Sequence, residues 1–323
     1  MAKTKILVAQ KVHPSIIQML EPYAQIVTIK ENDKEDLLEK IVDCEGILLG
    51  TWIKFDGKIM DKGKKLKVIS RTGVGVDSVD IEAATKRGIM VLHTPGANAL
   101  TVAEHALALI VALAKHLVFL DKQVREGEFK ARRLYLPEDI DKKTLGVVGF
   151  GAVGRTLATK CRLAFDMKII AYDPFVRCWP DWVGVVDHME DIFKKSDFIS
   201  LHLPLTKENH SIVDAKMLSY MKSSAFLVNT ARGEIIDEEA LYEALKENKI
   251  AGAGLDVFNE EPPDEENKLL TLPNVILTPH SGALTKECTL RVARGAVSGI
   301  IDYIEGRTPE YVYNKEVLFQ KGM

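Results

Sequence analysis

Short strand-like runs alternate with helical patterns from the first residues to about residue 280, and this alternation restricts the fold more than any other feature. The strand-like runs near the N-terminus are KILVAQ, IVTIK, GILLG, LKVIS and IMVLHT. Such alternation is typical of a parallel sheet with helical crossovers. Residues 1–97 are therefore predicted to form a doubly wound α/β domain.

A second alternating series begins with TLGVVGF and continues through KIIAYDP, DFISLHLP, AFLVNTA, AGAGLDV and NVILTPH. It predicts a second doubly wound domain over residues 98–287. Residues 101–127 read as one helix, apolar on almost every face in its middle, which predicts burial between two bodies. Residues 288–323 are expected to return to the first domain, so that helices near residues 100 and 290 act as hinges.

The charge balance gives no reason to expect a polyanionic partner. The chain has 43 Lys and Arg against 46 Asp and Glu among 323 residues. Such a balance gives no electrostatic reason to expect nucleic acid or an anionic membrane as partner. A small molecule is the more natural partner.

The N-terminus lacks a signal peptide pattern, and the longest apolar run, ALALIVALA, is too short for a bilayer span of roughly 20 residues. We therefore expect a cytoplasmic protein. Its four cysteines, Cys44, Cys161, Cys178 and Cys288, have no C-x-x-C spacing. This argues against a zinc cluster or a disulfide framework, so we expect reduced thiols and no metal.

A glycine pattern typical of dinucleotide sites opens the second domain. Gly149, Gly151 and Gly154 form G-x-G-x-x-G directly after a strand, with Ala152 and Val153 at the start of a helix. The first glycine permits a tight turn, the second lets the backbone approach a pyrophosphate, and the third lets the helix pack on the strand. Glycine-rich turns also arise for packing alone, but the strand–turn–helix context favours a cofactor.

Asp173 ends the next strand, nineteen residues after Gly154. A carboxylate there can accept hydrogen bonds from the adenosine ribose and would repel a 2′-phosphate. The alternative is a plain turn residue before Pro174. The spacing favours binding of NAD over NADP.

Three charged or titratable side chains follow strands of this domain. Arg232 follows AFLVN, Glu261 follows the strand that ends at Asp256, and His280 follows VILTP. Doubly wound sheets bind ligands at the carboxyl ends of their strands. Taken singly, they read as a surface charge, an acidic loop and a surface histidine. Together they predict a site at one sheet edge.

With these motifs the chain resembles the D-isomer specific 2-hydroxyacid dehydrogenase family, most closely its D-3-phosphoglycerate dehydrogenase branch. The resemblance covers nearly the whole chain, through SRTGVGVDSVDIEAATKRGI, TPGANALTVAEHALAL, VGFGAVG, SLHLPLT, VNTARGEIIDEEAL, GAGLDVFNEEPP and TPHSGALT. It implies an NAD-dependent oxidoreductase with a Rossmann cofactor domain, a flavodoxin-like substrate domain and a cleft between them. It also implies a homodimer.

The resemblance assigns roles to particular residues. It implies that Arg232, Glu261 and His280 are catalytic, and that the backbone amides of Val74, Gly75 and Val76 bind the substrate together with Arg232 and His280. The expected cofactor contacts beyond the glycine loop and Asp173 are Pro204, Thr230, Ala231, Asp256, His280 and Gly282.

The expected reaction passes a hydride between the nicotinamide and C2 of the substrate while a proton joins or leaves the oxygen. His280 is expected to handle the proton, because a neighbouring carboxylate such as Glu261 favours its protonated form and fixes its tautomer. Arg232 is expected to bind the substrate carboxylate through a planar fork that Lys cannot copy.

One position departs from the phosphoglycerate dehydrogenase pattern. Where that branch carries an arginine after the third strand, this chain has Gly50. Lys54, Arg132 and Arg133 are candidate replacements, although such a basic run is more often a solvated face. We therefore expect a broad 2-oxo acid activity, with 3-phosphoglycerate, hydroxypyruvate and glyoxylate as leading substrates.

Two rival functions share the fold. An NAD-sensing binding protein similar to transcriptional corepressors can keep all three catalytic residues, and only turnover separates it from an enzyme. The absence of disordered tails disfavours it. Formate dehydrogenase is disfavoured because that branch has a glutamine where Glu261 stands. No regulatory domain follows the last helix, so we expect no feedback control through one.

Overall fold

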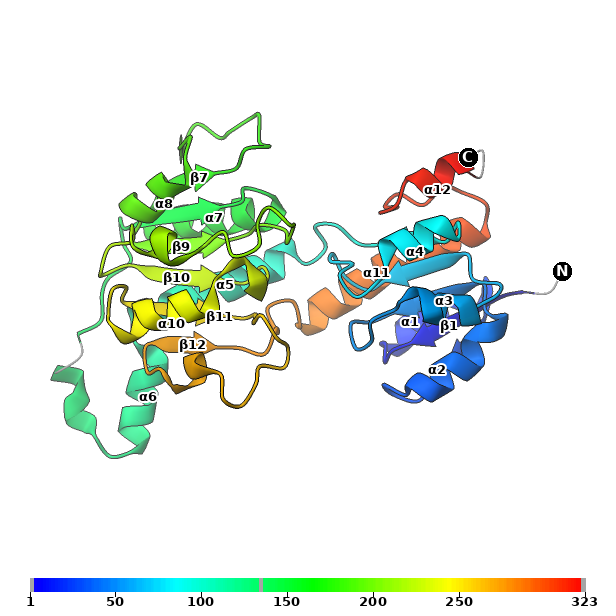
Figure 1. The fold of residues 1–323 in the computed structure, drawn as a ribbon, viewed down its shortest axis with the longest axis horizontal. Coiled ribbons are helices and arrows are strands. Elements are labelled where there is room, and N and C mark those ends of the chain that lie inside the picture. Colours follow the sequence, from blue (N-terminus) through cyan, green and yellow to red (C-terminus); the bar gives the residue numbers. More distant parts are fainter. Residues whose placement is uncertain (1–2, 134–135, 321–323) are drawn as a thin grey trace. The chain divides into compact units, whose positions relative to one another are not determined.

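The computed structural model describes residues 3–133 and 136–320, and the chain divides into two compact units (Figure 1). The first unit comprises Met1–Asn98 and Leu284–Met323, and the second comprises Ala99–Ala283. Each unit is built on one parallel sheet covered by helices. The predicted class, two doubly wound parallel-sheet units, is confirmed.

The sheet of the first unit has the strand order β2-β1-β3-β4-β5, and all neighbours are parallel. This is the flavodoxin-like order. Its strands are β1 Thr4–Ala9, β2 Ala24–Thr28, β3 Gly46–Leu49, β4 Val68–Arg71 and β5 Met90–Leu92. Its helices are α1 Pro14–Leu20, α2 Lys34–Lys40, η1 Ile41–Asp43, α3 Gly57–Lys62, α4 Ile81–Lys86, α11 Lys286–Ile304 and α12 Glu316–Gln320.

Successive residues of each strand in this sheet face opposite layers of helices. Leu7 belongs to the apolar cluster that includes residues of α2, α3 and α4, whereas Ile6 and Val8 belong to the cluster that includes residues of α1 and α11. A strand that is buried on both faces needs apolar residues at every position. This explains why the runs KILVA and GILL do not alternate with polar residues.

The C-terminal segment is attached to the edge of the first sheet. Val312 forms an isolated antiparallel bridge with Leu92, and the amide of Tyr313 donates to the carbonyl of Val91 at 2.8 Å. The side chain of Asn314 is buried and accepts from the amide of Val91 at 2.8 Å. Backbone and side-chain hydrogen bonds thus attach the C-terminal segment to the sheet of the first unit.

The sheet of the second unit has the order β12-β11-β10-β9-β6-β7-β8, again entirely parallel. If the strands are numbered within the unit, this is the Rossmann order with one added edge strand. The order in which the strands are added to the sheet switches sides between β6 and β9. Its strands are β6 Thr144–Val148, β7 Lys168–Tyr172, β8 Val183–Val185, β9 Phe198–Leu201, β10 Phe226–Asn229, β11 Gly252–Leu255 and β12 Val275–Leu277. Its helices are α5 Ala99–Ala114, α6 Leu117–Arg125, η2 Phe129–Arg133, α7 Ala152–Phe165, α8 Met189–Lys195, α9 Ala215–Leu218, η3 Gly233–Ile235, α10 Glu238–Lys246 and η4 Lys268–Thr271.

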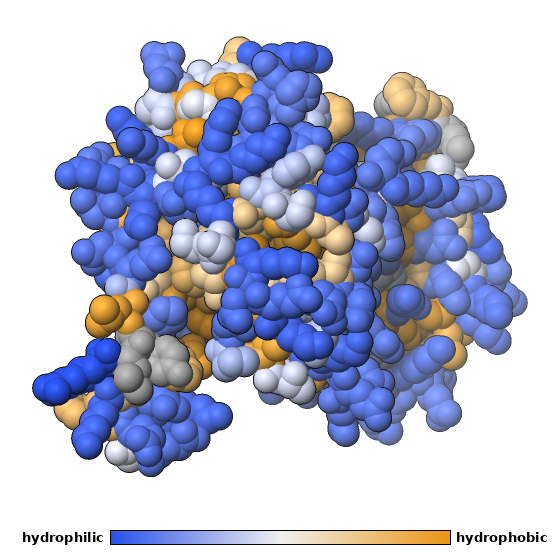
Figure 2. Space-filling model, turned by 60° about the vertical axis from the view of Figure 1, so that its left-hand side comes forward, coloured by the Kyte–Doolittle hydropathy of each residue, from blue (hydrophilic) through white to orange (hydrophobic). Residues whose placement is uncertain are grey.

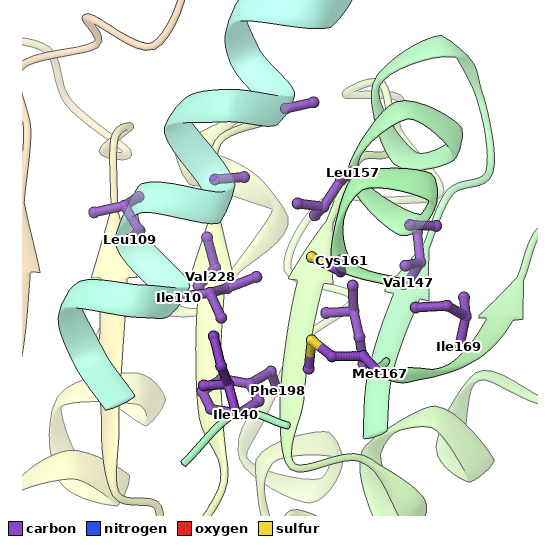
Figure 3. Close-up of a cluster of buried hydrophobic side chains, with 14 of the residues drawn as sticks. Leu109, Ile110, Ile140, Val147, Leu157, Cys161, Met167, Ile169, Phe198 and Val228 are labelled. Carbon is purple, nitrogen blue, oxygen red and sulfur yellow. The ribbon is translucent and has the colours of Figure 1, made fainter. Parts of the chain in front are cut away.

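Two apolar layers hold this sheet. One contains residues of α5 and α7, and Figure 3 shows Ile110 of α5 and Leu157 and Cys161 of α7 in this layer with strand residues such as Val147. The other layer contains residues of α8 and α10. The layers fix the sheet rigidly, so side chains at the ends of its strands keep defined positions.

The long helix predicted over residues 101–127 is wrong as a single element. It breaks at His116, which has a left-handed backbone with φ of 50°, and α5 and α6 meet at a 58° bend. The apolar face of α5 packs within the second unit, and burial of this helix between two bodies stays a prediction. In α6 no residue is buried, and Leu117 remains 52% exposed.

Among the described residues, only the bent pair of α5 and α6 has, taken together, the length and apolar content of a membrane span, and no single helix does. The face drawn in Figure 2 is mostly hydrophilic, with hydrophobic side chains showing between the polar ones.

Candidate active site

The loop after β6 has the shape that its three glycines suggest. Gly149 has φ of 91°, and a Cβ there would lie 2.6 Å from the carbonyl oxygen of His202. A Cβ on Gly154 would lie 2.2 Å from the carbonyl oxygen of Gly149. At Gly151 a Cβ would meet nothing within 4 Å. The outer glycines are therefore required by the protein itself, whereas Gly151 faces open space into which a pyrophosphate fits.

Gly151 is also the N-cap of α7, and no side chain there accepts a hydrogen bond from the first turn. The amides of Ala152 and Val153 in that turn are thus available to an anion, and the helix dipole favours negative charge at this end.

Asp173, directly after β7, is held beside this loop. Its carboxylate accepts hydrogen bonds from the amide of Phe150 at 2.8 Å and from the amide of Phe175 at 2.9 Å. The glycine loop thereby fixes the position of the carboxylate that the sequence assigned to the ribose.

Arg232, Glu261 and His280 follow β10, β11 and β12, which are neighbours in one parallel sheet. The carboxyl ends of parallel strands lie at one edge, so the fold brings the three loops together. The approach is close: a Cβ on Gly233 would lie 2.0 Å from the carbonyl carbon of Phe258. Only glycine fits where the Arg232 loop meets the loop that leads to Glu261.

His280 and Glu261 form a hydrogen-bonded pair. Nδ1 of His280 lies 2.6 Å from Oε2 of Glu261, while Oε1 of Glu261 accepts from the amide of Phe258 at 3.2 Å. The imidazole is 47% exposed and the carboxylate 37%. Since Nδ1 faces Glu261, the other ring nitrogen is the one left to act on a ligand.

The pair perturbs the ionisation of both members. The hydrogen bond that Nδ1–H of His280 donates to Glu261 raises the pKa of His280 above its ordinary value, although burial and the charge of Arg232 oppose this. For Glu261, burial opposes ionisation, but the hydrogen bond and charge of His280 outweigh it, so the pKa of this carboxyl is lowered. The arrangement favours an imidazolium beside a carboxylate, which is the form of a proton donor.

Arg232 precedes η3, and its Nη1 donates to the carbonyl of Ala231 at 2.6 Å. Its charge acts on both Glu261 and His280, lowering the pKa of each. A guanidinium this close to a proton donor can bind an anionic group next to the reacting oxygen.

A pocket of about 430 Å³ lies beside the pair. Its lining is mainly apolar, and the charged or titratable groups in it are Glu261 and His280 themselves. The lining residues are Phe258, Glu261, Pro262, Pro263, Leu277, Thr278, Pro279 and His280.

The other predicted cofactor residues lie at the same sheet edge. Thr230 and Ala231 follow β10, Asp256 follows β11, Gly282 lies beyond β12, and Pro204 follows β9. Within the described part of the chain, the buried Oγ1 of Thr230 has no hydrogen-bond partner. A buried polar atom of this kind fits a polar ligand group, such as a carboxamide.

The predicted substrate loop, Val74 to Val76, follows β4 in the first unit. Over residues 3–133 and 136–320, none of its three backbone amides donates a hydrogen bond to protein. Gly50 also belongs to this unit, and a Cβ there would lie 2.4 Å from Oε1 of Gln10. The arginine of the phosphoglycerate dehydrogenase pattern therefore has no room at this position unless Gln10 moves.

The candidate replacements for that arginine belong to different units. Lys54 is exposed in the first unit, whereas Arg132 lies in η2 of the second unit with its guanidinium 4.8 Å from the centre of the Phe129 ring. Arg133 is likewise an exposed residue of η2.

Sequence reasoning missed two histidines near the site. His105 of α5 contacts Thr278 and Asp256, and a polar residue in the otherwise apolar stretch VAEHALAL was the available signal. His202 follows β9, and burial lowers its pKa to about 4, so its ring stays neutral. No sequence pattern distinguishes His202 from a surface histidine.

The cysteines are free thiols, of which Cys44, Cys161 and Cys288 are buried and Cys178 is exposed. In the described ranges, no group of three or more His, Cys, Asp or Glu side chains is placed to hold a metal ion.

A Rossmann sheet with an open glycine loop and a fixed carboxylate after its second strand has the features of a nicotinamide-cofactor domain. Residues 107–282 match the family model described as D-isomer specific 2-hydroxyacid dehydrogenase, NAD binding domain. The chain belongs to this family.

Three similar proteins illustrate the relationship. D-3-phosphoglycerate dehydrogenase of Methanocaldococcus jannaschii is 41% identical over 96% of this chain, which spans 59% of that relative's length. Hydroxypyruvate reductase of Thermotoga maritima is 41% identical over 90% of this chain and 95% of its own length. D-lactate dehydrogenase of Aquifex aeolicus, solved with NAD and lactic acid, superimposes with a TM-score of 0.86 at 28% identity, covering 96% of this chain and 99% of its own.

Proposed function

We propose that this protein is an NAD-dependent D-2-hydroxyacid dehydrogenase that reduces a 2-oxo acid with His280 as the proton donor. The observation that carries the proposal is the 2.6 Å hydrogen bond between His280 and Glu261 at the sheet edge that also holds the glycine loop. Glu261 keeps the imidazole protonated and holds its Nδ1–H, so that Nε2–H faces the substrate oxygen.

The bound nicotinamide would supply or accept the hydride at C2 of the substrate. Arg232 would bind the substrate carboxylate and draw negative charge toward the oxygen that His280 protonates. The free amides of Val74, Gly75 and Val76 would bind the same carboxylate. Thr230 and Asp256 would bind the nicotinamide end of the cofactor, with Pro204, Ala231 and Gly282 packing around it.

We also propose that NAD is preferred to NADP. The carboxylate of Asp173 is fixed by two backbone amides, so it cannot easily turn away from the ribose. A 2′-phosphate placed there would meet this negative charge.

The substrate is proposed to be a small 2-oxo acid such as hydroxypyruvate or glyoxylate, with 3-phosphoglycerate oxidation as the competing activity. Two features support the first. Position 50 carries glycine in place of the arginine of the phosphoglycerate dehydrogenase pattern, and the described residues that line the pocket beside His280 include no Lys or Arg to bind a phosphate.

The test is a panel of 2-oxo acids, phosphorylated and unphosphorylated, with NADH and with NADPH. We expect turnover of hydroxypyruvate and glyoxylate with NADH. Absence of turnover with every 2-oxo acid, despite NADH binding, would return the protein to the class of NAD-sensing binding proteins. Turnover of phosphorylated substrates alone would overturn the substrate assignment.

A homodimer is part of the proposal. Support comes from the arm formed by α6 and η2, which exposes Leu117, Val118, Val124 and Phe129. Exposed apolar side chains on one arm suit a contact with a second copy. Light scattering at micromolar concentration should give the mass of two chains, and Val124→Glu should reduce it. A monomer in the unmodified protein would contradict the proposal.

A cytoplasmic location is proposed on the basis of the four free thiols, three of them buried, since such thiols persist in a reducing compartment.

A further inference from the structure

His105 of α5 is the start of a chain of hydrogen bonds that ends on the loop carrying His280. Its Nε2 lies 2.9 Å from Oγ1 of Thr278 and 3.4 Å from Oδ1 of Asp256. Oγ1 of Thr278 in turn lies 2.6 Å from Oδ1 of Asp256. Asp256 is only 2% exposed, so its carboxylate depends on protein donors.

The hydrogen bonds that join His105, Thr278 and Asp256 allow only one consistent assignment of donors and acceptors. A carboxylate can only accept, so the single hydroxyl proton of Thr278 points to Asp256. The hydroxyl oxygen can then only accept from His105, which requires a proton on Nε2 of that ring. His105 is therefore assigned the Nε2–H tautomer, and it donates toward Thr278 and Asp256.

Asp256 in turn accepts hydrogen bonds from the loop that carries His280. Its Oδ1 accepts from the amide of Ser281 and its Oδ2 from the amide of Gly282, both at 2.8 Å. Its backbone carbonyl accepts from the amide of His280 at 2.7 Å. One buried residue thus binds three successive amides of the loop.

The loop needs this support because His280 has a left-handed backbone, with φ of 49°. A non-glycine residue is disfavoured in that region and persists only where surrounding contacts enforce it. The ring of His105 also packs against the loop: a Cβ on Gly282 would lie 3.3 Å from its Cδ2. Loss of His105 removes both a donor and this packing.

We infer that His105 is a positioning residue: through Thr278 and Asp256 it holds His280 in the strained conformation that places its ring against Glu261. The inference rests on the proposed function for its effect on turnover, but its structural part can be measured without turnover.

The test uses the full-length protein with His105→Phe, which keeps a flat ring but has no donor, and His105→Gln, whose amide lies the same number of bonds from Cβ as Nε2. The control is His188→Phe, at an exposed histidine that makes no capping hydrogen bond on α8. Imidazole ¹⁵N NMR gives the tautomer of His105 and the pKa of His280, whose charged neighbours are Glu261, Arg232 and Asp256.

We expect the Nε2–H tautomer at His105. In His105→Phe the pKa of His280 should fall, because its contact with Glu261 loosens, and turnover should drop about tenfold to a hundredfold, as for a small misplacement of a reacting group. The Michaelis constant for NADH should change much less. His105→Gln should restore most of the turnover and the pKa, and His188→Phe should match the unmodified protein.

An Nδ1–H tautomer at His105, or an unchanged His280 pKa in a folded His105→Phe protein, would overturn the inference. So would equal losses in His105→Gln and His105→Phe, because packing alone would then explain them. If the unmodified protein reduces no 2-oxo acid, the proposed function fails, while the NMR titration still decides the positioning role.

Discussion

Nδ1 of His280 lies 2.6 Å from Oε2 of Glu261, although the two residues are 19 positions apart and follow different strands. Because β11 and β12 are parallel neighbours, their loops leave the sheet side by side. The contact raises the pKa of the imidazole and lowers that of the carboxyl. The fold thereby places an imidazole of raised pKa beside a carboxylate, as the proposed proton donor requires, and the following predictions depend on this pair.

Glu261→Gln should move the pH profile of 2-oxo acid reduction to lower pH. The raised pKa of His280 means that its proton is retained as pH rises through the ordinary value of 6.5 and is lost only above it. The glutamine keeps the shape but loses the charge, so the imidazolium is less stabilised and reduction fades earlier as pH rises. Steady-state rates across pH provide the measurement; an unchanged profile would remove Glu261 from the mechanism.

His280→Ala should lower the turnover number by roughly the 10²–10⁴ that a lost general acid costs. NADH affinity, measured by fluorescence titration, should remain nearly unchanged, because the glycine loop follows β6, four strands away from β12 in the sheet order. Near-normal turnover would show that His280 is an ordinary loop residue.

Arg232→Ala should raise the Michaelis constant for the 2-oxo acid and also lower turnover, because in the proposed function the guanidinium binds the carboxylate in the ground state and polarises the carbonyl. Loss of a hydrogen bond to a charged group costs about 1.5–3 kcal/mol. Removing this cation should also raise the pKa of His280, since its charge now lowers it. Arg87→Ala, which breaks an ion pair with Asp61 in the first unit, is the matched control. A pH profile that shifts downward in Arg232→Ala would contradict the assignment.

Asp173→Ala should shift cofactor preference toward NADPH, as it removes both the ribose acceptor and the charge that repels a 2′-phosphate. The amides of Phe150 and Phe175 lose their acceptor in this variant, so its melting temperature must be measured together with kcat/KM for both cofactors. Asp187→Ala, at an exposed position of the same unit, is the control. Equal or better efficiency of the unmodified enzyme with NADPH would refute the preference.

Gly233→Ala and Gly151→Ala should separate folding from cofactor binding. A methyl group at Gly233 would lie 2.0 Å from backbone of Phe258, so the loops of Arg232 and Glu261 must move apart, at a cost of about 1–3 kcal/mol in unfolding free energy. A methyl at Gly151 meets no protein atom within 4 Å and should leave stability unchanged while weakening NADH binding. Denaturant unfolding and NADH titration of both variants supply the measurements. Normal NADH binding by Gly151→Ala would show that the pyrophosphate does not approach there.

The sequence by itself determined the class of fold and most of the candidate site. The strand and helix alternation predicted parallel sheets, because parallel strands need long crossover connections, which are usually helices. The three glycines and Asp173 were readable because they lie within one continuous β6–α7–β7 stretch, at a spacing typical of dinucleotide sites. Arg232, Glu261 and His280 were found because each follows a strand, and parallel strands end at one edge.

Tertiary structure alone decided how these pieces are held. The break at His116 could not be predicted from the sequence, because the helical periodicity continues through it and a single residue with a left-handed backbone does not change that periodicity. The order of the strands, which makes the loops of Glu261 and His280 neighbours, depends on packing between distant segments. The chain from His105 to Asp256 spans 151 positions in sequence, and no local rule connects a histidine in an apolar helix to a carboxylate after a strand. Local residue chemistry predicts which groups can act; only the packed sheet determines which of them meet.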